Sequence, residues 1–191
     1  YFSMIMSIYI FDFDDVLFFN TDMFKKHMYT CFSEAGFELS LVKKHYKEER
    51  EKGFTLKRLL HAVCDSQKSV TVNSDELYEK IMSLCEVFIN VVLVEQIKKI
   101  GKENCYMLTH GVSEYQMEKV RRTKLEKYFK QIIIVQGTKK FAVENICEQY
   151  RDRKVIFVDD KQIRFDDLDY EKFPNLKTVL YTGMESLEEV F

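Results

Sequence analysis

The stretch of sequence that decides the fold is Ile8-Tyr9-Ile10-Phe11-Asp12-Phe13-Asp14-Asp15. It completes a short apolar run over residues 5–11, interrupted only by Ser7, and then ends in acidic residues. A short apolar run is typical of a strand that is buried on both faces. We therefore predict a buried strand whose carboxyl end is followed by Asp12 and Asp14.

Downstream of this strand, residues 21–90 show helical periodicity. Apolar residues recur there three and four positions apart, which places them on one face of a helix. The residues that define the four expected helices are Phe24, Met28, Cys31, Phe32 and Ala35; Leu41, Val42, His45 and Tyr46; Leu56, Leu59, Leu60 and Val63; and Leu77, Ile81, Leu84, Cys85 and Phe88. We expect Gly36 to end the first helix and Ser74 to cap the fourth.

After about residue 93, helices alternate with short apolar strands. The expected strands span residues 104–109, 131–135, 154–158 and 177–181, and helices are expected over 93–100, from Ser113 and from Thr138. This pattern indicates an α/β, Rossmann-like core in which helices cover both faces of a parallel sheet. The all-helical block is then an insertion. We predict a core domain of residues 4–18 and 91–191 and an inserted domain of residues 19–90.

Composition limits the class of protein and its partners. The chain has 191 residues, 46% of them hydrophobic, which suits one domain with a modest insertion. The net charge of −2 argues against a dedicated nucleic-acid-binding protein. No uninterrupted apolar run approaches the roughly 20 residues of a membrane span. We expect a cytoplasmic protein with no membrane partner, a monomer or weak dimer, and we interpret Tyr1-Phe2-Ser3 as an expression-tag remnant.

The cysteines and histidines point to no disulfide framework and no zinc site. The five cysteines include no CxxC pair and lie within apolar patterns, so we expect buried free thiols in a reducing cytosol. The four histidines include no HxxxH pair.

Polar residues of complementary chemistry follow four predicted strands. They are Asp12 and Asp14, Thr109-His110, Lys139-Lys140 and Asp159-Asp160. Ligands of parallel sheets bind at the carboxyl ends of the strands. If the strands are neighbours, the combination predicts a site for phosphate and a metal ion.

Each residue type suits one part of phosphoryl transfer. Crowded carboxylates repel one another unless a hard cation such as Mg²⁺ relieves the repulsion. An aspartate can attack phosphorus and form an acyl-phosphate. A second acid two residues later lies on the same side of an extended strand, where it can protonate the leaving oxygen and later activate water. A hydroxyl and an ammonium bind phosphoryl oxygens and offset charge in the transition state.

These motifs resemble those of the haloacid dehalogenase-like hydrolases, specifically the phosphatases of that superfamily. The resemblance rests on residues 8–17, which match a hydrophobic strand followed by DxDx(T/V), on Met107-Leu108-Thr109, on Lys139 or Lys140, and on residues 155–160. It covers nearly the whole chain. It implies a Rossmann-like sheet with a helical cap inserted after the first strand.

The resemblance also implies a role for each residue. Asp12 would be the nucleophile and Asp14 the general acid and base, while Thr109 and the lysine would hold the phosphoryl group. Mg²⁺ would be bound by Asp12, the backbone carbonyl of Asp14 and Asp160, with Asp159 assisting. The implied activity is Mg²⁺-dependent hydrolysis of a small soluble phosphomonoester through an aspartyl-phosphate. A phosphomutase and a non-catalytic binding protein on the same fold are the alternatives.

Helical periodicity favours Lys139 over Lys140 as the motif lysine. The expected buried stripe of the helix lies three, four, seven and eight positions after Lys139, whereas Lys140 is rotated by about 100°. The residues of that stripe are Ala142, Val143, Ile146 and Cys147. Lys140 stays the alternative.

Some positions depart from the family pattern. Asp15 stands where the family often has glycine, and Val16 replaces a common threonine. The fourth motif lacks an acid at the usual short spacing after Asp160, and Asp166 or Asp167 is the nearest later candidate for supporting the metal. Asp14 points to phosphate esters, because dehalogenases lack that second acid.

The inserted helices offer candidates for contacts with the substrate. Arg50 and Lys52 precede Gly53 between two expected helices, where they could reach a substrate anion, as could His110; a solvated helix end is the alternative for the pair. We expect hinges at residues 18–21 and 89–93, so that the insertion can open and close over the site.

Overall fold

The computed structural model describes residues 7–188 and 190–191. Within this range it contains a five-stranded parallel sheet of order β3-β2-β1-β4-β5. The strands are β1 (Ile8–Phe11), β2 (Cys105–His110), β3 (Gln131–Val135), β4 (Val155–Asp159) and β5 (Leu176–Leu180). The predicted parallel α/β sheet is confirmed. The start of the first expected strand, residues 5 and 6, and the suspected tag lie outside the described residues.

The strands are apolar throughout because both faces of the sheet are buried. Successive side chains of a strand point to opposite faces. Ile8 and Ile10 accordingly belong to one apolar cluster, while Phe11 belongs to the other. In β4, Phe157 and Val158 divide in the same way. An unbroken apolar run therefore stabilises both layers at once.

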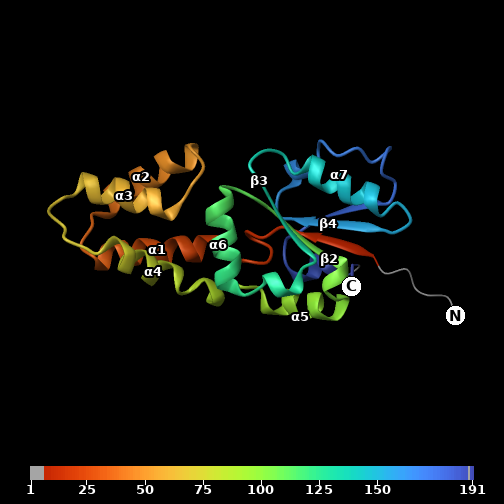
Figure 1. Ribbon diagram of the computed structural model, residues 1–191, viewed down its shortest axis with the longest axis horizontal. Helices are drawn as coiled ribbons and strands as arrows, with labels where there is room; N and C mark the ends of the chain where they lie inside the picture. The colour runs from red at the N-terminus through yellow and green to blue at the C-terminus, as the bar shows by residue number, and fades with distance from the viewer. Residues whose placement is uncertain (1–6, 189) are drawn as a thin grey trace.

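Helices cover the two faces of the sheet (Figure 1). One face packs against α7 (Lys140–Gln149), and the other packs against α5 (Val91–Ile100) and α6 (Ser113–Thr123). Single-turn 3₁₀ helices occupy the connections: Cys85–Phe88, Lys102–Asn104, Glu126–Tyr128, Gln162–Arg164 and Met184–Leu187.

The segment between β1 and α5 is all-helical and lies to one side of the sheet (Figure 1). It consists of α1 (Thr21–Glu34), α2 (Leu39–Glu51), α3 (Leu56–Ser66) and α4 (Ser74–Met82). Helix α1 contacts α2 and α4, and α3 contacts the same two helices. Buried residues of these helices, among them Met28, Leu59 and Ile81, belong to the apolar cluster that also covers one sheet face.

The fourth helix of this segment is shorter than predicted. Helix α4 ends at Met82, and Cys85–Phe88 forms a separate 3₁₀ turn that contacts α1 and α6. The cap is Asn73, whose side chain accepts hydrogen bonds from the backbone N–H groups of Asp75 and Glu76. Ser74 is the first helical residue, so its prediction as the cap is wrong by one position.

Other boundaries differ by one to three residues. Helix α5 begins at Val91, because the Asn90 side chain caps it, and α7 begins at Lys140 instead of Thr138. All five cysteines are free. Four are buried as expected, whereas Cys64 is half-buried. Among the described residues, no helix combines the length and the apolar character that crossing a membrane requires.

The two stretches that connect the helical segment to the sheet domain lie next to each other. Phe18 and Ile89 form an isolated antiparallel bridge, and the N–H of Phe19 donates to the carbonyl of Phe88. The Asn90 side chain donates to the carbonyl of Val16 and to the hydroxyl of Tyr181. The two expected hinge stretches therefore lie side by side and contact the sheet domain through Asn90.

Candidate active site

Parallel pairing brings the polar strand ends together. The central strand β1 pairs with β2 on one side and with β4 on the other. Asp12 follows β1, and its N–H donates to the carbonyl of Val158, so Asp12 lies beside the end of β4. Thr109 lies near the end of β2 and Asp159 ends β4. The predicted adjacency of these residues follows from this strand order.

Lys139 reaches the same place from the start of α7. Its ammonium lies 2.7 Å from Oδ1 of Asp12 and 2.6 Å from Oδ2 of Asp159, and its side chain is 2% exposed. Lys140 turns away: its ammonium donates to the backbone carbonyl of Asp167 and lies 3.5 Å from Glu144. Lys139 therefore supplies the positive charge at the strand ends.

The carboxylate of Asp12 is held through one of its two oxygens. Oδ1 accepts a hydrogen bond of 2.7 Å from the N–H of Phe13 and faces the ammonium of Lys139. Among the described residues, no hydrogen bond reaches Oδ2. Burial raises the pKa of Asp12 to about 7 and the charge of Asp159 adds to the rise, whereas Lys139 opposes it. One oriented carboxylate oxygen is thus left free to react.

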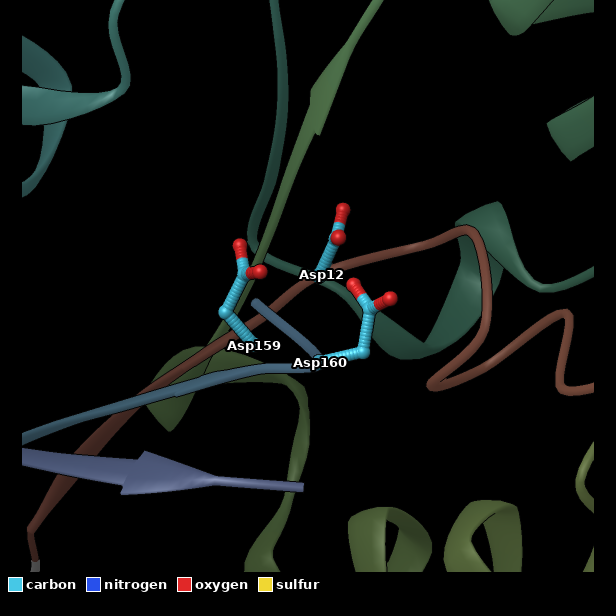
Figure 2. Close-up of side chains that lie close together, drawn as sticks. All are labelled: Asp12, Asp159 and Asp160. Carbon is cyan, nitrogen blue, oxygen red and sulfur yellow. The ribbon is translucent and has the colours of Figure 1, made fainter. Parts of the chain in front are cut away.

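Three acids form a candidate metal site (Figure 2). Asp12, Asp159 and Asp160 each offer a carboxylate oxygen, and these oxygens lie within 4.8 Å of one another. The N–H of Lys161 donates to Oδ1 of Asp159, and its ammonium lies 3.2 Å from Oδ2 of Asp160. Burial raises the pKa of Asp160. An all-carboxylate set of this size suits a hard divalent cation such as Mg²⁺.

The two later acids lie elsewhere. Oδ1 of Asp166 accepts a hydrogen bond from Gln162, and Oδ2 of Asp167 accepts one from Thr138. Neither joins the cluster of acids found among the described residues. Residue 164, four positions after Asp160, is an arginine.

Asp14 is held by two residues of α6 that the sequence analysis did not select. The ammonium of Lys119 donates to Oδ1 of Asp14, and the amide of Gln116 donates to Oδ2 at 2.8 Å and to the carbonyl of His110 at 2.8 Å. Burial alone would raise the pKa of Asp14, but the charge of Lys119 and these hydrogen bonds lower it. Lys119 lies on the buried face of α6 next to Val120, which is an unusual place for a lysine. A lysine within the apolar pattern of this helix was the feature of the sequence that could have identified it.

Thr109 places a hydroxyl among the strand ends. Its Oγ1 is buried and has no hydrogen bond among the described residues. A buried polar atom that makes no hydrogen bond costs free energy, so the atom is suited to an incoming acceptor such as a phosphoryl oxygen. The adjacent His110 is hydrogen-bonded through Nε2 to the carbonyl of Gln136. Burial, followed by the charge of Arg164, lowers the pKa of His110.

A cleft of about 590 Å³ opens between the strand ends and the helical segment. Several predicted site residues line it: Asp12, Asp14, Thr109, His110, Lys139 and Arg50. Lys52 is not among the described lining residues, and its ammonium lies 3.3 Å from Oε1 of Glu49. The structure thus brings Arg50 into the cleft and leaves Lys52 and Lys140 outside it.

Asp15 has the backbone conformation that glycine favours. Its φ is 62°, in the left-handed region. The N–H and the hydroxyl of Thr21 both donate to the Asp15 carboxylate, which ties the turn after β1 to the start of α1. These hydrogen bonds account for an aspartate at a position of this conformation, because Asp tolerates it when its side chain bonds locally.

Comparison by sequence gives no match, either to a family model or to a curated protein. Comparison by structure is informative. A protein assigned as a haloacid dehalogenase-like hydrolase from Burkholderia xenovorans matches with a TM-score of 0.68 at 17% identity, over 95% of this chain and 84% of the other. This chain has the haloacid dehalogenase-like fold.

Two further structures of this fold class cover nearly the whole chain. A haloacid dehalogenase family enzyme from Bacteroides thetaiotaomicron, in complex with magnesium and inorganic phosphate, has a TM-score of 0.60 at 15% identity and covers 97% of this chain and 99% of its own. A protein assigned as a β-phosphoglucomutase from Thermotoga maritima has a TM-score of 0.53 at 16% identity over 96% and 91%. The resemblance of the sequence motifs to haloacid dehalogenase-like hydrolases therefore extends to the fold.

Proposed function

We propose that this chain is a Mg²⁺-dependent phosphatase that hydrolyses a small phosphomonoester through an aspartyl-phosphate. The observation that carries the proposal is the state of Asp12. One of its oxygens is held by Phe13 and Lys139, and the other, at the edge of a cleft, accepts no hydrogen bond from any residue that the structure describes. Covalent catalysis requires a nucleophile in such a fixed position.

In the first step, Asp12 attacks the phosphorus atom of the substrate. A bond forms between a carboxylate oxygen and phosphorus, and the bond from phosphorus to the leaving oxygen breaks. Thr109 and Lys139 bind the non-bridging oxygens and stabilise their charge. Asp14, when protonated, donates its proton to the leaving oxygen.

In the second step, water hydrolyses the aspartyl-phosphate. Asp14, now ionised, takes a proton from the water molecule, the new oxygen–phosphorus bond forms, and Asp12 leaves. Lys119 and Gln116 hold Asp14 in this ionised form. The first step requires the protonated form, so the pair between Asp14 and Lys119 has to loosen when substrate binds.

The residues fit a magnesium ion. Asp12, Asp159 and Asp160 would hold it, together with the backbone carbonyl of Asp14 that the family resemblance implies. A bound Mg²⁺ would withdraw charge from a phosphoryl oxygen and would offset the repulsion between the carboxylates.

The helical segment is the proposed cap. It contributes Lys25, Tyr46, Arg50 and Phe54 to the wall of the cleft opposite the strand ends. Closure of the cap over a bound substrate would exclude bulk water from the cleft, apart from the water molecule that reacts in the second step. A phosphorylated metabolite of small size is the substrate class that a cleft of about 590 Å³ favours.

Hydrolysis of p-nitrophenyl phosphate with Mg²⁺, and with EDTA, tests the proposal. We expect phosphate to be released only when the metal is present. With a ³²P-labelled phosphomonoester as substrate, we expect the protein itself to become transiently labelled. Asp12→Asn is the control for contaminating phosphatases, because the amide is nearly isosteric and a poor nucleophile. Transfer of the phosphoryl group to a sugar phosphate without release would indicate a phosphomutase, and the absence of turnover and labelling would indicate a binding protein.

A further inference from the structure

The cationic side chains that line the cleft divide into two groups. Each of the four lysines has a carboxylate partner: Lys25 with Asp22, Lys119 with Asp14, Lys139 with Asp12 and Lys161 with Asp160. The two arginines, Arg50 and Arg164, have no ion pair among the described residues. A guanidinium recognises carboxylate and phosphate groups through paired hydrogen bonds. These two arginines therefore have free capacity to bind an anion.

Arg164 belongs to the reacting end of the cleft. It ends the 3₁₀ turn Gln162–Arg164 that follows β4. His110, the residue after Thr109, is close enough for the charge of Arg164 to contribute, after burial, to its lowered pKa. A phosphoryl group held by Thr109 would lie near this arginine.

A row of aromatic rings connects Arg50 with the ammonium of Lys119. Its guanidinium is 6.0 Å from the centroid of the Tyr46 ring. The Tyr46 ring is 5.0 Å from the ring of Phe54, which is 5.5 Å from the ring of Tyr115. The ammonium of Lys119, the partner of Asp14, is 5.7 Å from the Tyr115 ring. Three rings, all of them lining the cleft, thus link Arg50 to Lys119, the partner of Asp14.

We infer that the substrate carries a second anionic group, a carboxylate or another phosphate, at the end remote from the reacting phosphoryl group, and that Arg50 binds this group. The aromatic row between the two ends offers apolar surface for the carbon skeleton of such a molecule. The inference rests on the proposed function and names its substrate class, a doubly anionic phosphomonoester.

The test uses pairs of substrates that differ in the second anion. Suitable pairs are glycerol 3-phosphate with 3-phosphoglycerate, and a hexose 6-phosphate with the corresponding 1,6-bisphosphate. For the wild-type chain we expect kcat/KM to be at least about tenfold higher for the doubly anionic member of one pair, as a charge-assisted hydrogen bond predicts. Arg50→Gln should abolish this preference by raising KM, with kcat for that substrate retained.

Lys52→Gln is the matched control. It removes the same charge two positions away, from a side chain that pairs with Glu49 outside the cleft, and should retain the preference. Arg164→Gln should lower kcat/KM for both members of a pair alike, because that arginine lies at the reacting end. The ratio of kcat/KM between the two substrates of a pair is insensitive to partial unfolding of a variant, because loss of folded protein lowers both rates equally.

Failure of the inference and failure of the proposed function give different results. Turnover of p-nitrophenyl phosphate with no preference in either pair, or a preference that survives Arg50→Gln, would overturn the inference alone. No turnover of any phosphomonoester would overturn the proposed function, and the inference with it.

Discussion

The ammonium of Lys139 lies 2.7 Å from Oδ1 of Asp12, although Asp12 follows β1, Lys139 precedes α7, and the whole helical segment lies between them in the sequence. The same ammonium is 2.6 Å from Asp159. One buried cation therefore faces two buried carboxylates, and a further positive charge is needed for balance.

Replacing Asp12, the proposed nucleophile, should stop turnover and stabilise the fold. The pKa of Asp12 is 3.8 in the unfolded reference and about 7 in the folded chain, so the folded form binds the proton more tightly. Raising the pH through this window ionises the buried group and lowers stability. Asp12→Asn removes that cost, so we expect its Tm in EDTA to exceed the wild-type Tm by more at pH 8 than at pH 5. Thermal melts at both pH values check this prediction. A difference in Tm between variant and wild type that is smaller at pH 8 than at pH 5 would contradict it.

Replacing Asp14, the proposed general acid and base, should slow the hydrolysis of esters with poor leaving groups most. We expect Asp14→Asn to lower kcat by roughly 10²–10⁴, the usual range for general acid–base catalysis. The loss should be smaller for p-nitrophenyl phosphate than for an alkyl phosphate, because a good leaving group needs less protonation. Steady-state kinetics on both esters decide the point; equal losses would argue against proton donation by Asp14.

The two neighbouring lysines should differ sharply. Lys139→Ala leaves Asp12 and Asp159 without their cation and should cost at least tenfold in kcat/KM, about 1.4 kcal/mol or more. Removing one partner of a buried ion pair also destabilises the fold, by about 3–5 kcal/mol, so circular dichroism must accompany the assay. Lys140→Ala, the matched control, should change little. A dead Lys140→Ala variant with an active Lys139→Ala variant would reverse the assignment.

Replacing Asp159, the last residue of β4, and replacing Asp160, the residue after it, should have different effects on metal binding and on stability. Asp160 is the more exposed, so Asp160→Ala should weaken Mg²⁺ binding with a modest effect on Tm. Asp159 is fully buried and accepts from Lys139 and Lys161. Asp159→Ala should therefore lower the free energy of unfolding more and Mg²⁺ affinity less. Calorimetric titration with Mg²⁺ and denaturant unfolding give the two rankings, and the opposite order in the titration would show that Asp159 is the principal ligand.

The turn after β1 offers a test of backbone strain. Asp15→Ala and Asp15→Gly both lose the hydrogen bonds from Thr21, but only alanine keeps the cost of a positive φ. We expect the alanine variant to be less stable than the glycine variant by about 1 kcal/mol. Urea unfolding of the two proteins measures the difference directly, and equal stabilities would show that this turn relaxes to another conformation.

Local patterns predicted much of the fold because they follow from the periods of helices and strands. Unbroken apolar runs marked four of the strands to within one residue, since both faces of the sheet are buried. Caps were less predictable: Ser74 and Asn73 are both good cap residues, and only the direction of the chain before α4 selects Asn73. The 3₁₀ turn Cys85–Phe88 continued the helical spacing and was mistaken for part of the fourth helix.

The sequence by itself determined which residues stand at the strand ends, because the apolar runs stop at Asp12, Thr109 and Asp159. Helical period also oriented Lys139 inward. Only the tertiary structure decided what those residues meet. The pairing of Lys119 with Asp14 joins positions 105 residues apart, and the separation of Arg50 from Lys52 depends on how α2 packs. Such contacts depend on how whole helices and strands pack against one another. The spacing of apolar residues within a single helix or strand does not specify that packing.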